Sequence, residues 1–570
     1  MRNKNYYNPR SPEPRPPINQ GIDENNSIVL SHAEIYNVLL SSVTSANTYE
    51  NAILTLNPYG TAPLSMYLGV WVDAVEPITI TSIDEDSSSL PISYEYKPVT
   101  GANLIPVSGL IPDANNKITL ESQSFGTVDY FTQTAPLPPS DSATVTNGFP
   151  VSKLTVLTDD TSLLAEGLYF STSFFRYNYA YDHNGVVRWY TTNDIPAFNM
   201  VRIANGNFLT TASNVNNNLD MYEFDIIGRV HRFYILDNSF HHSIWQMPDG
   251  NIMATSQHNN GREDELPEDR TNEDGVSIVD LSTGLEVAYY DMIYVMDFLR
   301  QPRPYGEVYG EDNVYDWLHL NQSYLNTTNN LIISSSRHQS AVFGVDATTS
   351  ALAFVMATHE GWDPAFNEYL LTPVDETGAP LYDFSKQEDI DLANAEFWTW
   401  GQHHCVEIAN DTPNIVEFIV FDNGNFRSRD DSKSVLPNDN YSRTVQYRIN
   451  LSDMTVMKLY EYGQEVGNRG YSSFVCANFI LDNGNIVIMF GGRVIDENER
   501  VSTVEPGLSD IIDPLEGSMA QGTMLLQEIN PNTGTLLFEM EFIAGYFKDI
   551  ETYGRWDLSA FRVYKMDLYP

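Results

Sequence analysis

The stretch DHNGVVRWY, residues 182–190, shows the pattern on which the fold depends. Its Asp-His-Asn-Gly turn leads into a run of apolar and aromatic residues, which is typical of a β-hairpin. Five more turns rich in Asp, Asn or Gly stand between strand-like runs, at 225–228, 280–284, 346–350, 450–453 and 530–534. A second family of hairpin turns is interleaved with the first, at 205–207, 249–251, 328–330, 410–413 and 482–485.

Two hairpins per unit give four strands per unit. Six such units over about 400 residues predict a six-bladed β-propeller, in which the first strand of each unit lines a central channel. The units are unevenly spaced, so an irregular all-β array is the alternative.

The N-terminal region predicts a second, smaller β fold. Short alternating runs at 92–96 and 117–120 indicate strands of a small β-sandwich, with one helical segment at about 32–45 before it. Residues 134–150 are rich in Pro, Ser and Thr and predict a linker. The expected organisation of this all-β chain is a disordered Pro-rich arm at 1–22, a β-sandwich domain with its linker at 23–150, and a catalytic six-bladed propeller at 151–570.

Composition excludes several classes of partner. The formal net charge of −45 argues against nucleic acid and against an anionic membrane surface, since both would be repelled. Residues 1–17 hold no apolar signal-peptide core, and no run of eighteen apolar residues occurs, so we expect a cytoplasmic protein without a membrane helix. Cys405 and Cys476 are expected to be buried thiols, with a disulfide between them as the alternative.

Four segments gather histidine or arginine where the central channel would lie, although the chain has only 11 histidines. His242, His319 and His403 each lie five residues before an apolar residue that precedes a hairpin turn. We therefore expect these histidines in phase on equivalent inner strands. Asn321 shares the phase of His319, and Arg337 lies at the far end of the neighbouring strand, so both are expected at the same site.

Imidazoles beside a guanidinium predict a site for an anionic group, with chemistry at a histidine. We expect no cofactor and no metal there. One alternative is a metal-dependent propeller hydrolase such as a lactonase, with the histidines as ligands, although Arg337 would repel the cation. The other is a non-catalytic binding propeller with a polar channel.

These segments resemble one known family, the bacterial arylsulfate sulfotransferases, which work without a nucleotide sulfate donor. The resemblance covers most of the chain and rests on the ordered stretches NPYGTAPL (57–64), FHH (240–242), DWLHLN (316–321), SSRHQ (335–339), EGW (360–362), YLLTPV (369–374), GQH (401–403) and FDNG (421–424).

The resemblance implies a β-sandwich ahead of a six-bladed propeller, and a homodimer. It also implies a ping-pong reaction in which a histidine takes a sulfuryl group from an aryl sulfate donor and passes it to a phenolic acceptor. Carried over by position, the nucleophile is His403. The family's other sulfuryl-binding positions fall on His319, Asn321, Arg337 and one of His241 or His242. We choose His242 as the catalytic one, with His319 and Arg337, because its strand phase equals that of His319 and His403. The expected substrate-binding residues are Asn321, His241 and His404.

Overall fold

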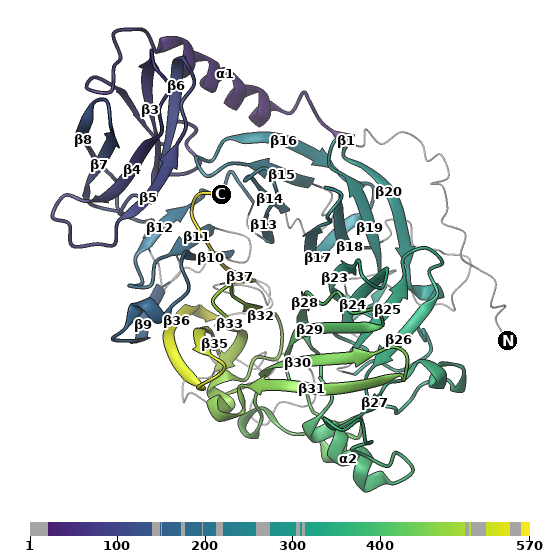
Figure 1. The fold of residues 1–570 in the computed structure, drawn as a ribbon. Helices are drawn as coiled ribbons and strands as arrows, with labels where there is room; N and C mark the ends of the chain where they lie inside the picture. The colour runs from purple at the N-terminus through teal and green to yellow at the C-terminus, as the bar shows by residue number, and fades with distance from the viewer. Residues whose placement is uncertain are drawn as a thin grey trace.

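Six β-sheets stand side by side around a ring in the described part of the chain, and a two-sheet unit packs on the outside of the ring (Figure 1). The structure is a computed structural model that describes residues 21–139, 149, 151–172, 177–196, 198–211, 220–257, 274–303, 308–309, 314–495, 501–502, 520–547 and 560–570. The predicted all-β fold, a six-bladed propeller after an N-terminal sandwich, is confirmed.

Each blade is an antiparallel sheet whose strands lie side by side, one after another from the centre of the ring to its rim. The innermost strands are β37 (Val563–Met566), β13 (Met200–Arg202), β17 (Ser239–Gln246), β23 (Leu320–Asn326), β28 (His403–Ile408) and β32 (Ala477–Ile480). The second strands are β10 (Leu168–Thr172), β14 (Phe208–Thr211), β18 (Ile252–Gln257), β24 (Leu331–Ser336), β29 (Ile415–Asp422) and β33 (Ile486–Ile495).

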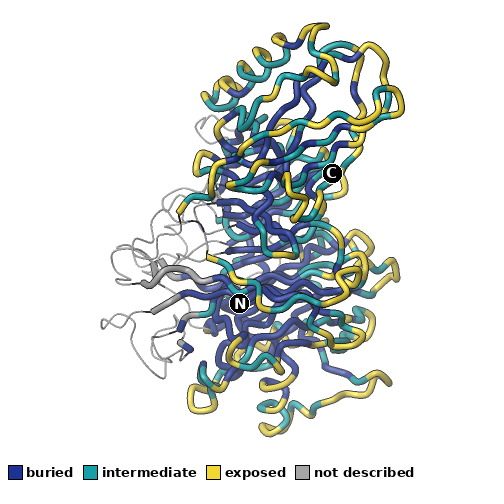
Figure 2. The backbone as a smooth tube through the Cα atoms, turned by 90° about the vertical axis from the view of Figure 1, so that its left-hand side faces the viewer, coloured by how far each residue is buried: buried dark blue, intermediate teal, exposed yellow. Residues whose placement is uncertain are grey.

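The outer half of each blade repeats the same arrangement. The third strands are β11 (Asn178–Tyr181), β15 (Asp220–Phe224), β19 (Asp274–Asp280), β25 (Ala341–Asp346), β30 (Arg443–Asn450) and β35 (Ala520–Asn530). The fourth strands are β12 (Val187–Tyr190), β16 (Val230–Ile235), β20 (Leu285–Asp291), β26 (Leu352–Met356), β31 (Thr455–Tyr462) and β36 (Thr535–Phe547). Figure 2 shows buried residues through the middle of the blades and exposed residues at their turns.

The hairpin turns form for the reason that the sequence suggested. Asp182 accepts backbone hydrogen bonds from Asn184 and Val186 with one carboxylate oxygen, and Gly185 takes a φ of 78° that L-residues rarely adopt. All six turns of the first family join the third and fourth strands of a blade, and the five of the second family join the first and second strands.

The ring is closed by both ends of the propeller segment. β9 (Val151–Leu157) adds to β36 in the last blade, and β37, near the C-terminus, is the innermost strand of the first blade. A buried ion pair joins these two blades, because Lys565 of β37 lies 2.6 Å from the carboxylate of Glu528 in β35. Tyr169 of β10 donates to the same carboxylate at 2.6 Å.

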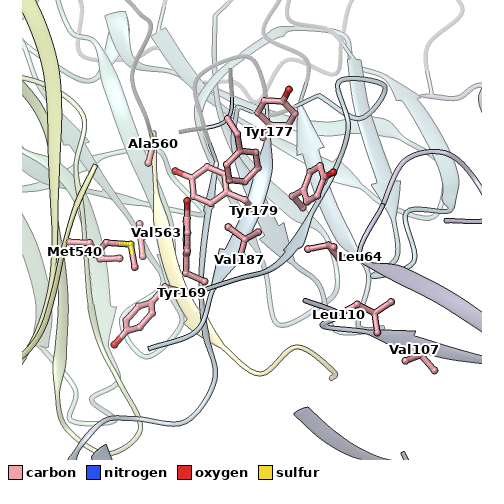
Figure 3. Packing of buried hydrophobic residues seen from close by; sticks show 14 of the residues in the cluster. Leu64, Val107, Leu110, Tyr169, Tyr177, Tyr179, Val187, Met540, Ala560 and Val563 are labelled. Carbon is pink, nitrogen blue, oxygen red and sulfur yellow. The ribbon is translucent and has the colours of Figure 1, made fainter. Parts of the chain in front are cut away.

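The N-terminal unit is a sandwich of two sheets, with strand orders β2-β3-β6 and β5-β4-β7-β8. Its strands are β2 (Ile53–Leu56), β3 (Ser65–Val72), β4 (Ile78–Asp84), β5 (Ile92–Tyr96), β6 (Gly101–Ser108), β7 (Asn115–Ser122) and β8 (Gly126–Gln133). Its core continues into the propeller: Leu64 and Val107 belong to the same buried cluster as Tyr179, Met540 and Val563 (Figure 3).

The helix before the sandwich is α1 (Ser27–Ser42), which begins earlier than the expected segment because the side chain of Asn26 caps its first turn. Gly21 and Ile22, expected in the disordered arm, instead form β1 (Gly21–Ile22) on the outer edge of β16. Residues 1–20 and most of the predicted linker lie outside the described residues.

Polar contacts hold the sandwich against the propeller. The buried guanidinium of Arg188 in β12 donates to the carbonyl oxygens of Gly109 and Leu90 and pairs with Asp182 at 3.1 Å. Tyr569, near the C-terminus, stacks on Tyr94 of the sandwich with a ring separation of 3.7 Å. The chain therefore brings its N-terminal unit and its C-terminal residues together.

Smaller elements complete the fold. β27 (Thr372–Pro373) extends the rim beside β31, and α2 (Gln387–Glu396) follows it. The remaining short elements are η1 (Thr161–Leu163), η2 (Met292–Tyr294), η3 (Pro364–Tyr369), η4 (Asp431–Lys433), η5 (Pro437–Asp439), η6 (Gln464–Gly470), β21 (Val308–Tyr309), β22 (Val314–Tyr315) and β34 (Val501–Ser502).

The structure also bears on two expectations from the sequence, the state of the two cysteines and the absence of a membrane helix. Cys405 and Cys476 are both buried free thiols, so the alternative of a disulfide between them is wrong. Among the described helices, none combines the length and the apolar character that crossing a membrane requires.

The ion pair at the ring closure predicts a stability effect. Lys565→Met leaves the Glu528 carboxylate buried without its cation, so we expect the free energy of unfolding in urea to fall by about 3 to 5 kcal/mol. Adding Glu528→Gln should recover part of the loss. Lys97→Met, which removes an exposed partner of Glu95, should change little. Equal losses for Lys565→Met and Lys97→Met would contradict a role for the buried pair.

Candidate active site

Three histidines from three neighbouring blades meet near the centre of the ring. One ring nitrogen from each of His242, His319 and His403 lies within 4.8 Å of the other two. The Nε2 atoms of His242 and His319 are 3.1 Å apart, and the His242 and His403 ring centroids are 6.4 Å apart. The structure thus brings together the three histidines that the sequence placed at one site.

They do not meet through a shared strand phase. The inner strands β17, β23 and β28 each carry a bulge, where the pairing with the second strand shifts register. Left-handed backbone, with φ of 57°, 52° and 51°, falls on His242, His319 and His404. His403 therefore reaches the cluster from the residue before the left-handed position. The expectation that the three histidines occupy equivalent positions is wrong in this respect, because a bulge breaks the alternation of side chains.

His319 is held by a carboxylate. Its Nδ1 donates to Asp316 Oδ2 at 2.5 Å. A neutral His319 therefore offers its Nε2 lone pair, and His242 Nε2–H donates to it. His242 Nδ1 can then accept from Nδ1–H of His241, 3.0 Å away. The far nitrogen of His241, Nε2, lies 3.1 Å from Oδ1 of Asp274. A line of three imidazoles thus runs between two carboxylates.

Arg337 and His338 form the neighbouring wall. Arg337, buried just after β24, donates to Nε2 of His338 at 2.6 Å. His338 Nδ1 therefore carries the proton and donates to the backbone carbonyl of Asp316 at 2.6 Å. The positive charge of Arg337 acts on both His319 and His403.

His403 is oriented by an amide. Its Nδ1 lies 2.8 Å from Oδ1 of Asn423 and 3.1 Å from the carbonyl oxygen of Gly401, so Nδ1–H donates to both. The amide nitrogen of Asn423 is itself fixed by the backbone carbonyl of Ser472, to which it donates at 2.7 Å. This arrangement leaves Nε2 as the unprotonated nitrogen of a neutral His403.

The three residues expected to bind substrate have different surroundings. His241 lies beside the cluster, at the end of the imidazole line. Asn321 is fully buried and donates to the carbonyl oxygen of Gln402 at 2.6 Å, which links β23 to the segment before β28. His404 points away: its Nδ1 accepts from the Asn478 backbone N–H at 3.2 Å, and its ring packs on Phe479. The structure therefore does not bring His404 into the histidine cluster.

Burial keeps these histidines unprotonated. Desolvation, with the neighbouring charges of His319, His241 and Arg562, holds the pKa of His242 well below its ordinary value. Desolvation and the charge of Arg337 do the same for the pKa of His403. Burial also lowers the pKa of His319, although Asp316 opposes the effect.

Asp316 stays ionised because of the two histidines beside it. Burial alone would raise the pKa of this carboxyl, but the charges and hydrogen bonds of His319 and His338 lower it well below its ordinary value. The site therefore combines neutral imidazoles with an ionised carboxylate behind them. His319 keeps 14% of its side chain exposed, so one edge of the cluster reaches solvent.

Sequence reasoning missed four residues of this site. Asp316 and His338 stand beside predicted residues, three positions before His319 and one after Arg337, and Asn423 belongs to one of the family-like stretches. Arg562 carried no signal, because it stands just before the C-terminal strand and belongs to no recurring pattern. Only ring closure brings it beside the histidines, where its charge acts on His242 and His403.

Comparison with known proteins gives an independent finding. A family model described as Arylsulfotransferase (ASST) matches residues 153–553, and one described as Arylsulfotransferase Ig-like domain matches residues 53–138. The chain is 24% identical over 523 residues to arylsulfate sulfotransferase AssT of Lelliottia amnigena, covering 77% of this chain and 85% of the relative.

Two further similarities are more limited. The AssT of Escherichia coli O6:H1 (strain CFT073) is 28% identical over 307 residues, which cover 48% of this chain and 49% of that protein, so this match spans about half of the relative. Among solved structures, the β-propeller domain of Cps50 (Swd1) from Myceliophteria thermophila is similar at a TM-score of 0.27 and 9% identity, covering 69% of this chain and 99% of that one.

The buried histidines predict how stability depends on pH. In the unfolded chain a histidine binds its proton near pH 6.5, whereas folded His403 and His404 bind theirs only at much lower pH. The unfolded state therefore holds more protons below pH 6.5, and the free energy of unfolding should fall as pH is lowered, by about 1.4 kcal/mol per pH unit for each histidine. Urea unfolding between pH 5 and 7 measures this slope.

Substitution identifies the responsible groups. His403→Gln and His404→Gln should each reduce the slope by about 1.4 kcal/mol per pH unit. Cys405→Ser, at a buried neighbour whose pKa is raised by burial, should lower stability without changing the slope. An unchanged slope in both histidine variants would show that these side chains do not stay neutral in the folded protein.

Proposed function

Because this chain belongs to the arylsulfotransferase family, we propose that it moves a sulfuryl group from an aryl sulfate donor to a phenolic acceptor, without a nucleotide donor. The family match over residues 153–553 confirms the resemblance drawn from the sequence. We further propose a ping-pong route through a sulfated histidine. The homodimer implied by the resemblance stays a prediction.

The observation that carries this proposal is the state of His403. Asn423 takes its Nδ1–H, burial disfavours its protonation, and Nε2 is left with a lone pair beside His242 and His319. Such a nitrogen is a ready nucleophile. A guanidinium close enough to act on it, that of Arg337, supplies charge for the oxygens of the group under attack.

In the first half-reaction, Nε2 of His403 attacks sulfur while the bond from sulfur to the aryl oxygen breaks. The electron pair of that bond leaves with the phenolate. Sulfuryl transfer resembles phosphoryl transfer in having a loose transition state with charge on the peripheral oxygens, so positioning and fixed positive charge supply most of the catalysis. Arg337 supplies that charge, and His319 and His242 line the other side of the group.

The line of imidazoles offers a route for the phenolic proton. His242 Nε2–H turns from His319 to the departing phenolate oxygen. His241, entering this step as an imidazolium with Nε2–H toward Asp274, then passes its Nδ1 proton to Nδ1 of His242 over their 3.0 Å separation. Both histidines end neutral, and the leaving group ends as a phenol. In the second half-reaction an acceptor phenol returns a proton by the same route as its oxygen attacks sulfur and the bond from nitrogen to sulfur breaks.

A metal-dependent hydrolase is the main competing function, because the same three ring nitrogens lie close enough together to bind one ion. Charge argues against it. The positive charges of Arg337 and Arg562 both act on His403 and would oppose a cation there, whereas they favour an anionic sulfate. A non-catalytic binding propeller would have no use for a neutral nucleophile.

The covalent step is tested by mass. Incubation with 4-nitrophenyl sulfate, without acceptor, should add one sulfuryl group, about 80 Da, to the intact wild-type protein. His403→Ala should gain nothing, because the attacking nitrogen is gone. His404→Gln should still gain the group, because His404 faces Asn478 and Phe479.

Each other outcome points elsewhere. An adduct on His403→Ala but not on His404→Gln would move the nucleophile to His404. Turnover with a phenol but no adduct would favour direct transfer. Turnover lost after chelation, with stoichiometric metal in the untreated protein, would favour the hydrolase. A wild type that forms no adduct, shows no turnover and holds no metal would favour the non-catalytic binding propeller.

The pH dependence of the donor half-reaction follows from the histidine pKa shifts. His403 must be neutral to attack, and its pKa lies well below 6.5, so kcat/KM for 4-nitrophenyl sulfate should stay nearly constant from pH 7.5 down to about pH 6 and fall only below it. An acid limb centred at pH 6.5 or above would contradict a desolvated nucleophile.

A further inference from the structure

Arg562 reaches the centre of the ring from the C-terminal end of the chain, where the sequence predicted no site residue. It directly precedes β37, the strand that closes the ring, and is only 2% exposed. Its guanidinium donates to Gln322 Oε1 at 2.7 Å and to the backbone carbonyls of Asn321 at 2.8 Å and His242 at 3.0 Å. One side chain thereby joins β17 and β23, the strands that present His242 and Asn321.

This guanidinium lacks the carboxylate partner that several other buried arginines have. Arg188 pairs with Asp182 at 3.1 Å, and Arg427 and Arg443 both pair with Asp422, at 3.0 and 2.8 Å. Within the described residues no carboxylate forms an ion pair with Arg562, whose acceptors are neutral oxygens. Burial accordingly lowers the pKa of Arg562 to about 10.

An uncompensated buried charge costs several kcal/mol and persists where something offsets that cost. The titratable groups on which its charge acts are the imidazoles of His242, His403 and His404 and the hydroxyl of Tyr564. Its charge disfavours protonation of the three imidazoles. The other charged or titratable groups that face His403 are Arg337, His319 and His242. The positive charges of Arg337 and Arg562 thus both act on His403.

We propose that Arg562 is a positioning residue for sulfuryl transfer: it clamps the backbone that presents His242 and Asn321, and its buried charge attracts the anionic sulfate of the donor. The substrate part of this inference rests on the proposed function. The anion that balances Arg562 arrives with the substrate, so the protein carries the cost of the buried charge only until the donor binds.

The test uses Arg562→Gln, which can keep part of the hydrogen bonding without the charge, and Arg562→Lys, which keeps the charge without the planar fork. Histidine labelled with ¹³C allows His403 to be followed by NMR, with assignment from His403→Gln. In Arg562→Gln the midpoint of His403 protonation should rise by about one pH unit, and the acid limb of kcat/KM should move with it. The KM for 4-nitrophenyl sulfate should rise about tenfold.

Arg562→Lys separates charge from clamping. It should leave the His403 midpoint near the wild-type value while lowering kcat, because Lys cannot hold the carbonyls of His242 and Asn321 and the amide of Gln322 together. Lys565→Met is the matched control, since it removes a buried cation from the same strand whose partner is Glu528. It should lower stability and leave both the midpoint and the KM unchanged.

The outcomes are distinct. If Arg562→Gln shifts the His403 midpoint and the KM no more than Lys565→Met does, Arg562 is only part of the ring closure and the proposal is wrong. If the wild type neither forms an adduct nor turns over aryl sulfate, the proposed function fails. In that case a shifted midpoint in Arg562→Gln would still establish the effect of its charge on His403, and the inferred attraction of a sulfate ester would be overturned.

Discussion

Closing the ring is the constraint on which the rest of the structure depends. A twisted array of sheets leaves two unpaired edges unless its ends meet, and here they meet twice, through β9 on the last blade and β37 in the first. The buried pair of Lys565 and Glu528 fixes the second of these contacts. Because β37 is an innermost strand, the same step that closes the fold also delivers Arg562 to the centre. The strand that closes the fold therefore also places a residue beside the histidine cluster.

The centre of the ring is polar, and hydrogen bonds make that tolerable. Asn321, Asn423 and His338 are fully buried, and each has a backbone partner at 2.6 to 2.7 Å. These contacts satisfy groups that would otherwise cost free energy in a dry interior. Hydrogen bonds also fix which nitrogen of each histidine carries its proton. Asp316 accepts from Nδ1 of His319 and Asn423 accepts from Nδ1 of His403, so each neutral histidine keeps a lone pair on Nε2.

Much of the fold could be predicted from the sequence, because hairpin turns depend on residues that are close together in the chain. Eleven hairpin turns were visible, six in one family and five in the other, and the missing twelfth has a physical reason: the sixth inner strand is β37, which comes from the far end of the chain and needs no hairpin. The helix, the sandwich and the three converging histidines were equally accessible. The sequence did not predict three features: the bulges at His242 and His404, the outward direction of His404, and the approach of Arg562. Each of these depends on contacts between distant segments.

Charge links this small site to the whole molecule. A surface with a formal net charge of −45 repels anions at long range, so selectivity for one must come from fixed groups at short range. Arg337 and Arg562 are such groups, since both are buried, where water and salt screen them little. Both raise the cost of protonating His403, and both favour an incoming sulfate. We propose that these two guanidinium groups, which add to burial in keeping His403 neutral, also attract the anionic substrate, so that a cluster of histidines resembling a metal site in geometry is suited instead to an anion.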